Sequence, residues 1–382
     1  MHPQLHGFFK FYDAAQDKSE NLLRTIYSAS SLYTLLKGYP LNKDPKIEQL
    51  FKPIAQFILS NQLQDGPNAG GFYYGYNPVT NKKTCRVVVG TASKTIFTLL
   101  ELNRFYPNDP QYLQAARKAG DWLLRMVQPE GQVTPTAVCG KGDWQYRHQQ
   151  SLLYSGQVLS ALSRLYGVTQ DPRYLQGATR IATYFVSLVK EKGALLGDDF
   201  RPANSISTSW VMMSLIDFAK VNPEPLYREI IEQLSAKILS RQITNKEDIF
   251  SNGRYLDAMT TSGNGWINEV MGVLHGFCID NKMLNCQQYQ QAMTLTSRWL
   301  IQNAYSKENT YNVKNPAHAI GGFITNFTTQ TVRTDAVCHG VNSLINLLSM
   351  IGSQEQMLVD LPEKPLQELL PLLRAGNGFL SS

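Results

Sequence analysis

Hydrophobic and polar positions repeat along this chain as two alternating kinds of helical segment. In the first kind, apolar residues cover most of the helix circumference. In residues 151–166, for example, Leu152, Leu159 and Leu162 recur at a helical spacing, with Gly156 between them. A helix that is apolar on most faces is typically buried. The pattern predicts buried helices at 21–37, 92–106, 151–166, 206–220, 265–279 and 335–351.

The second kind of segment carries charge on one face and follows the first kind. Residues 109–116 and 171–178 share the pattern D-P-x-Y-L-Q-x-A, which indicates internal repetition. Proline near the first turn is typical of a helix start, because its missing N–H has no partner there in any case. Half-buried helices are predicted at 45–61, 110–127, 172–190, 225–241, 287–305 and, with prolines interrupting the pattern, 354–375.

Six such alternations predict an all-α fold, an (α/α)6 toroid with six inner and six outer helices in one domain over residues 1–382. The outer-to-inner connections are long, so we expect them to gather at the N-terminal ends of the inner helices and to carry function. Two of them, 70–90 and 321–340, run from Gly-Gly-Phe through a turn to an arginine, Arg86 or Arg333. We expect both to be short β-hairpins.

Charge, hydropathy and cysteine pattern argue against several classes of partner and location. The formal net charge is +6, but no dense Lys/Arg block is present, so nucleic acid is not expected as a partner. No apolar run is long enough to span a membrane, and the N-terminus lacks the pattern of a secretory signal. The five cysteines are scattered and include no CxxC pair, which favours free thiols and a cytoplasmic protein. The pattern gives no oligomeric state.

The segment Ser262–Leu274, SGNGWINEVMGVL, resembles the R-G-N/Q-G-W segment that opens an inner helix in unsaturated uronyl hydrolases, with Ser262 in place of the arginine. The adjacent Asp198 and Asp199 resemble the paired aspartates of toroid-type endo-mannanases. Together with the helix pattern, the chain resembles the six-hairpin toroid superfamily of carbohydrate-active enzymes. The resemblance implies a saccharide cleft at the N-terminal ends of the inner helices.

Four acids are candidates for carboxylate chemistry, since glycoside hydrolysis generally uses two carboxyl groups. Glu269 lies in the first turns of an inner helix after Trp266, where apolar surroundings would raise its pKa and make it a general acid. One of Asp198, Asp199 or Asp257, all in loops, would be the second group. The alternatives are a first-turn glutamate stabilised by the helix dipole and solvated loop acids.

Asp335 and His339 are four residues apart, hence on one helix face, and could form an acid–imidazole pair beside Arg333. The alternative is a helix cap with a locally satisfied histidine. Sugar rings stack on aromatic side chains, and polar groups bind their hydroxyls. The expected substrate-binding residues are Arg86, Trp144, Arg147, His148, Tyr255, Asn264, Trp266 and Arg333.

These features predict a glycoside hydrolase-like enzyme that needs no cofactor and no metal. An epimerase or lyase on the same ring would use His148 or His339 with a tyrosine instead. A terpene-type cyclase would need an acid cluster that the chain does not supply. Cys338-His339-Gly340 resembles the zinc-binding segment of lanthionine cyclases. A non-catalytic glycan-binding toroid is the remaining alternative.

Overall fold

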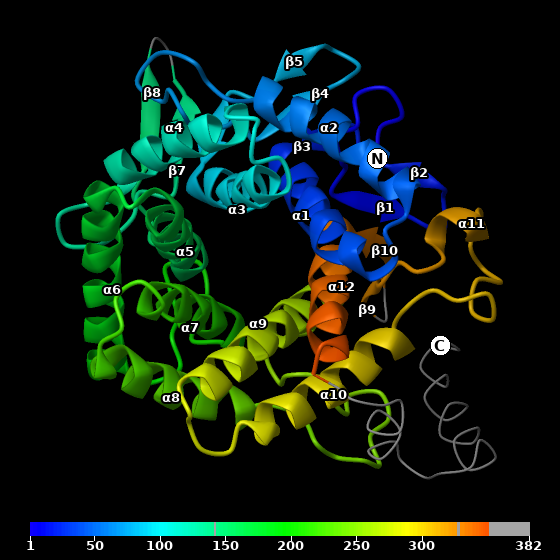
Figure 1. Ribbon diagram of the computed structural model, residues 1–382. Helices are drawn as coiled ribbons and strands as arrows, with labels where there is room; N and C mark the ends of the chain where they lie inside the picture. The colour runs from blue at the N-terminus through cyan, green and yellow to red at the C-terminus, as the bar shows by residue number, and fades with distance from the viewer. Residues whose placement is uncertain (141–142, 327–328, 351–382) are drawn as a thin grey trace.

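The long helices form two concentric layers in the computed structural model, which describes residues 1–140, 143–326 and 329–350 (Figure 1). The inner helices are α1 (Thr25–Asn42), α3 (Val89–Phe105), α5 (Leu152–Thr169), α7 (Ser205–Ala219), α9 (Thr261–Asp280) and α12 (Thr334–Leu348). The outer helices are α2 (Pro45–Ser60), α4 (Gln111–Met126), α6 (Pro172–Lys192), α8 (Pro225–Leu239) and α10 (Gln287–Gln302), and α11 (Pro316–Ala319) is a single turn.

Contacts between neighbouring helices close the inner layer into a ring. Each inner helix contacts the next along the chain, and α12 packs against α1. The outer helices α2, α4, α6, α8 and α10 pack on α1, α3, α5, α7 and α9. This arrangement confirms the predicted (α/α)6 toroid. The expected helix at 354–375 lies outside the described residues.

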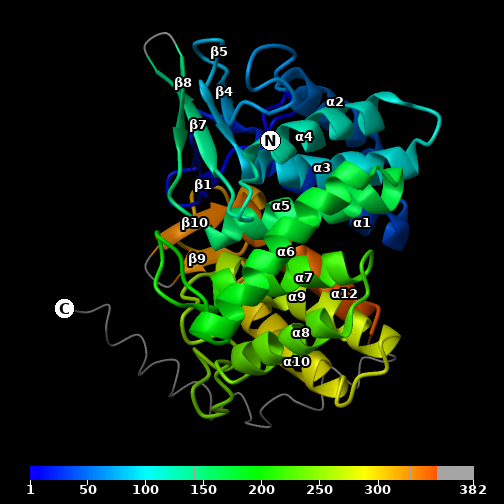
Figure 2. The ribbon, with the colours of Figure 1, turned by 90° about the vertical axis from the view of Figure 1, so that its left-hand side faces the viewer.

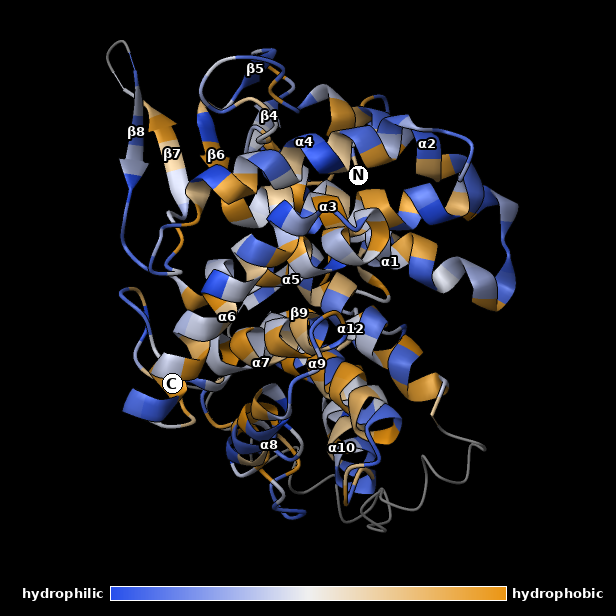
Figure 3. Ribbon diagram, turned by 60° about the vertical axis from the view of Figure 1, so that its left-hand side comes forward, coloured by the Kyte–Doolittle hydropathy of each residue, from blue (hydrophilic) through white to orange (hydrophobic). Residues whose placement is uncertain are grey.

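The inner helices approach one another closely because glycine stands at their contacts. A Cβ atom at Gly156 on α5 would lie 2.7 Å from the carbonyl oxygen of Trp210 on α7. One at Gly265 on α9 would lie 3.0 Å from the backbone nitrogen of Gly340 on α12. Larger side chains would push these helices apart. In Figure 3, hydrophobic residues dominate α7 and α9, whereas the outer α4 shows much hydrophilic surface.

Short antiparallel sheets gather on the face of the ring where the inner helices begin (Figure 2). One sheet has the order β2-β1-β10-β9, a second β3-β4-β5 and a third β6-β7-β8. The strands are β1 (Phe11–Asp13), β2 (Lys18–Ser19), β3 (Leu23–Arg24), β4 (Gly75–Asn77), β5 (Lys82–Lys83), β6 (Arg86–Val88), β7 (Thr136–Cys139), β8 (Trp144–Arg147), β9 (Ile324–Asn326) and β10 (Thr329–Arg333).

The two expected hairpins are present, but they differ. The loop 321–340 forms β9 and β10, and Arg333 ends β10 directly before α12. In the loop 70–90 the hairpin is β4–β5, whereas Arg86 begins β6 and pairs with Val138 on β7. Strand β1 pairs with β10, Phe11 opposite Arg333, so the N-terminal segment joins the last hairpin at the seam of the ring.

Four of the five cysteines are paired, so the expectation of free thiols was wrong for them. Cys85 is bonded to Cys139 and Cys278 to Cys286, while Cys338 is free and buried. The pairing of β6 with β7 brings Cys85 opposite Cys139, and the turn between α9 and α10 joins the other two. Sequence spacing gives no sign of either contact. Among the described helices none has the length and apolarity needed to cross a membrane.

Candidate active site

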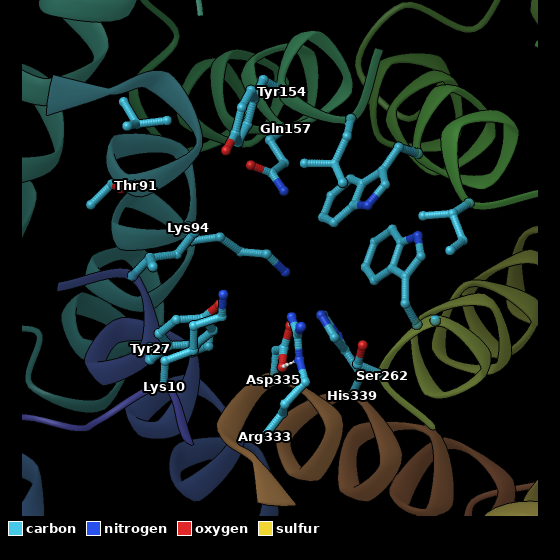
Figure 4. A pocket seen from close by; sticks show the side chains of 18 of the residues that line it. Lys10, Tyr27, Thr91, Lys94, Tyr154, Gln157, Ser262, Arg333, Asp335 and His339 are labelled. Carbon is cyan, nitrogen blue, oxygen red and sulfur yellow. Dashed lines mark hydrogen bonds and ion pairs between the residues drawn. The ribbon is translucent and has the colours of Figure 1, made fainter. Parts of the chain in front are cut away.

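A pocket of about 460 Å³ lies where the inner helices begin (Figure 4). All six contribute to it from their first turns: Tyr27 on α1, Lys94 on α3, Tyr154 and Gln157 on α5, Trp210 on α7, Ser262 and Trp266 on α9, and Asp335 and His339 on α12. Lys10, Tyr74 and Arg201 reach it from loops, and Arg333 reaches it from the end of β10. The pocket therefore lies at the end of the ring that the helix pattern predicts.

His339 and Glu269 form a hydrogen-bonded pair at this pocket. The Nδ1 atom of His339 is 2.6 Å from one carboxylate oxygen of Glu269, and Asn342 donates to the other from 3.1 Å. The two side chains come from α12 and α9, which pack directly against each other. His339 lines the pocket, while Glu269 is buried beneath it. The carboxylate is thus held on both oxygens by the neighbouring helix.

The environment of Glu269 lowers its pKa, contrary to the sequence-based expectation that it is raised. Burial alone raises the pKa, but the hydrogen bond from His339 and the charges of His339, Lys94 and Lys37 bring it to about 2. The carboxyl group is therefore ionised at neutral pH and can only accept hydrogen bonds. It follows that Nδ1 of His339 carries the hydrogen, which leaves Nε2 as the basic nitrogen when the ring is neutral.

Asp335 is paired with Arg333 rather than with His339. Two guanidinium nitrogens of Arg333 lie 2.9 Å and 2.5 Å from the carboxylate oxygens of Asp335, in the fork geometry typical of arginine (Figure 4). Burial raises the pKa of Asp335, but this hydrogen-bonded cation outweighs it and the pKa is lowered. The expected pairing of Asp335 with His339 was wrong, because Arg333 binds the carboxylate of Asp335 and Glu269 from another helix binds Nδ1 of His339.

Lys94 contacts an aromatic cluster next to the pair. Its Nζ atom lies 4.8 Å from the ring centroid of Trp210 and 5.1 Å from that of Trp266. The two tryptophans are stacked with centroids 3.5 Å apart, and Trp266 also contacts His339 edge-on. Burial lowers the pKa of Lys94 to about 8 despite the nearby charge of Glu269. Lys94 is thus a cation whose proton is readily lost.

The loop acids lie elsewhere. Asp198 accepts hydrogen bonds from the backbone N–H of Leu152, at the start of α5, and of its own loop. Asp199 accepts from the N–H of Gln150. Asp257 accepts from the N–H of Ser205, at the start of α7, and from Arg241. None of the three lines the central pocket. Each holds the start of the preceding inner helix in place.

The expected binding residues are divided between several places. Trp266 and Arg333 line the central pocket, and Arg86 and Arg147 line an adjoining pocket of about 440 Å³. His148 lines a third, smaller pocket with Trp122. Tyr255 is fully buried, and Asn264 uses its amide to bind the backbone of Tyr255, Ala258 and Thr260. Trp144 packs against the core from β8.

Several pocket residues were not identified from the sequence. Tyr27, Tyr154, Gln157 and Trp210 lie in the first turns of inner helices. Glu269 was selected from the sequence because it lies in such a position, and the same criterion applied to neutral residues would have found these four. Lys10 and Arg201 lie in loops, and no pattern in the sequence marks them.

The segment Cys338-His339-Gly340, which resembles the zinc-binding segment of lanthionine cyclases, is not accompanied by a set of metal ligands in the described residues. Over residues 1–140, 143–326 and 329–350, no group of three or more His, Cys, Asp or Glu side chains could hold a metal ion. The Cys338 thiol faces Ser31 on α1, with its sulfur 3.7 Å from the hydroxyl, and burial raises its pKa to about 11. Nδ1 of His339 is bound to Glu269, which is not part of any such group.

Comparison with known proteins shows the fold. No family model and no curated protein sequence matches the chain. A cellobiose 2-epimerase from Bacillus thermoamylovorans is similar in structure, with a TM-score of 0.67 and 12% identity, over 90% of this chain and 93% of that one. An inactive variant of an α-1,6-mannanase from Salegentibacter sp., in complex with α-1,6-mannotriose, has a TM-score of 0.64 and 11% identity, over 91% and 95%. An unsaturated glucuronyl hydrolase specific for heparin has a TM-score of 0.63 and 12% identity, over 91% and 92%. The chain shares their (α/α)6 toroid.

Proposed function

We propose that this chain is a carbohydrate-active enzyme that moves a proton on a sugar, as an epimerase or a lyase does, with His339 as the acid–base group. The observation on which the proposal depends is the His339–Glu269 pair, with the imidazole at a pocket lined by all six inner helices. A general base oriented by a buried carboxylate is a common arrangement for proton abstraction.

The chemistry follows from the hydrogen bond. Glu269 accepts from Nδ1 and leaves Nε2 of His339 to take a proton from a carbon next to a carbonyl or carboxyl group. The electron pair left on carbon moves into that group, where cationic and hydroxyl donors such as Lys94, Arg333 and Tyr27 can stabilise the negative charge. The protonated imidazole of His339 then has two outcomes. It returns a proton to the other face of the carbon once the planar intermediate has turned, which inverts the centre, or it protonates a neighbouring oxygen as that oxygen leaves, which gives elimination.

Hydrolysis by two carboxyl groups has less support. Of the described acids, Asp335 lines the pocket and Glu269 lies under it, and each is bound by a basic side chain that keeps its pKa low. A general acid needs a raised pKa to hold its proton at neutral pH. The similar mannanase is inactive when two adjacent aspartates are replaced. The adjacent pair in this chain, Asp198 and Asp199, is occupied by backbone N–H groups.

The similar solved structures fit a sugar substrate, since they include cellobiose 2-epimerases, a mannanase with a bound mannotriose and a glucuronyl hydrolase. The pocket is of small-molecule size and combines tryptophan rings with several polar groups, as saccharide sites require.

The test is a panel of reducing disaccharides and uronate-containing polysaccharides incubated with the protein in D2O and followed by proton NMR. We expect an epimerised or unsaturated product, with deuterium at the carbon that loses its hydrogen. His339→Gln should reduce the rate about 100-fold or more, the usual contribution of a general base.

Arg228→Gln is the matched control, because Arg228 is exposed on the outer helix α8 and pairs with Glu232, one turn away. Its rate should equal that of the wild type. New reducing ends without an epimerised or unsaturated product would mean hydrolysis and would contradict the proposal, as would a fully active His339→Gln.

A further inference from the structure

The central pocket and its neighbour form one strongly cationic groove. The central pocket is lined by Lys10, Lys94, Arg201 and Arg333, and the adjoining pocket by Arg86, Arg147 and Arg201. Leu153, Tyr154 and Arg201 line both, so the two are continuous. Asp335 is the one carboxylate among the lining residues of both pockets. The groove therefore has six cationic side chains and one anionic one.

Most of these cations lack an anionic partner. Arg333 is paired with Asp335, but no described carboxylate lies within ion-pair distance of Lys10, Lys94, Arg86, Arg147 or Arg201. Figure 4 shows Lys94 extended into the pocket toward Arg333 and His339. Lys10, Lys94 and Arg86 are partly buried, whereas Arg147 and Arg201 are exposed. A cation held partly out of water is unfavourable unless an anion or a hydrogen-bond acceptor offsets the lost hydration. Burial lowers the pKa of Lys94, and the nearby charge of Glu269 offsets this only in part.

The three arginines of the outer pocket come from three different elements. Arg86 comes from β6, Arg147 from β8 and Arg201 from the loop before α7. Arg86 stacks over Tyr74, which itself lines the central pocket. Arginine on three separate elements that face one hollow is suited to carboxylate or sulfate groups, which its planar fork binds through two hydrogen bonds.

We propose that the groove binds an oligosaccharide with negatively charged groups along its chain. One charged unit would lie in the central pocket against Lys94, and a second in the outer pocket against Arg86, Arg147 and Arg201. This assignment of the substrate class rests on the proposed function of the central pocket. A carboxylate in the central pocket would also make the neighbouring C–H more acidic once Lys94 neutralises it, which suits proton abstraction by His339.

Each pair of probes shares a sugar backbone and differs in charge. The pairs are oligogalacturonate and its methyl ester, hyaluronan and alginate oligosaccharides with their esters, and dextran sulfate with dextran. Binding is measured by titration calorimetry on the His339→Gln protein, so that the probe is not consumed. We expect at least one anionic probe to bind tenfold or more tighter than its uncharged counterpart, and the binding to weaken with salt. The carboxylate and sulfate arms distinguish the two sources of charge.

Variants separate the two ends of the groove. Arg147→Gln should weaken binding of a hexasaccharide about tenfold and leave a disaccharide unaffected, because a charge-assisted hydrogen bond is lost only in the outer pocket. Lys94→Met should weaken both. Arg228→Gln on the outer surface should weaken neither.

Equal binding of charged and uncharged probes, or no binding of any anionic probe, would overturn the inference. Equal binding of a single-stranded DNA oligonucleotide would also overturn it, because the groove would then recognise charge alone. These outcomes do not depend on catalysis. A protein that binds the anionic probes but forms no epimerised or unsaturated product would retract the proposed function and leave the anion site in place.

Discussion

At the scale of single residues, the chemistry of a side chain depends on its partners more than on its place in a helix. Glu269 lies in an apolar inner helix, as expected, yet its pKa is lowered to about 2 because His339, Lys94 and Lys37 are close. The same position without those bases would favour the protonated acid. A carboxylate that was expected to donate a proton thus becomes one that orients an imidazole.

Glu269→Gln tests this role. The proton-transfer rate should fall about 100-fold or more, because the imidazolium formed in the reaction loses its stabilising charge. The ionised carboxylate also stabilises the fold, on the order of 3 kcal/mol, fully above about pH 4.5 and progressively less as the pH falls through about 2. Urea unfolding of the two proteins should therefore differ near pH 6 and converge toward pH 2.

Replacing Lys94 by methionine should raise the stability of the fold at neutral pH, whereas replacing Glu269 lowers it. The pKa of Lys94 is lowered from 10.5 in the unfolded chain to about 8, so the unfolded state binds more protons between these values and stability rises with pH there. The variant should be more stable than the wild type at pH 7, on the order of 3 kcal/mol, with the difference lost by about pH 10.5. Chemical denaturation from pH 7 to 10.5 measures it, and a variant less stable at pH 7 would contradict it.

At the scale of elements, the acids of one loop fix the start of the preceding inner helix. Asp198 and Asp199 bind backbone N–H groups at and before the start of α5, and Asp257 does the same at the start of α7. Both helices present pocket residues within their first turns, so these loop acids position the pocket without lining it. Acidic residues in the loops around the pocket are therefore not by themselves evidence of a catalytic role.

Asp257→Asn should lower the free energy of unfolding by about 1–3 kcal/mol, because the charged hydrogen bond from Arg241 is lost while the amide can still accept from Ser205. Urea denaturation measures this change. Once folded, the variant should keep its proton-transfer rate within about threefold. A stable but inactive Asp257→Asn would instead restore this residue to the catalytic set.

At the scale of the whole molecule, cross-links and a strand pair hold distant parts of the ring together. The Cys85–Cys139 bond joins two outer-to-inner loops that line the outer pocket, and β1 pairs with β10 at the seam. Both are contacts between segments far apart in sequence. They were not predicted because neither cysteine spacing nor strand pattern identifies a distant partner.

The disulfides should differ in their effect on stability. Loop-closure entropy predicts about 4 kcal/mol for the Cys85–Cys139 bond, which spans 54 residues, and about 2 kcal/mol for Cys278–Cys286, which spans 8. Thermal unfolding of Cys85→Ser/Cys139→Ser and Cys278→Ser/Cys286→Ser double variants compares them. Mass spectrometry of the unreduced protein should first show two bonds and one free thiol. An equal loss in both variants would mean that native-state contacts rather than chain entropy dominate.

The sequence alone determined the alternation of buried and half-buried helices, their approximate bounds and the end of the ring that holds the pocket, because helical periodicity and loop length are local properties of a chain. It also singled out Glu269, Trp266, Arg333 and His339. Only the tertiary structure decided their roles. His339 contacts Glu269, 70 residues earlier in the chain, and Lys94 contacts the tryptophans of α7 and α9. Closure of the ring brings these helices together, and the order of the helices along the chain does not specify which of their side chains are in contact.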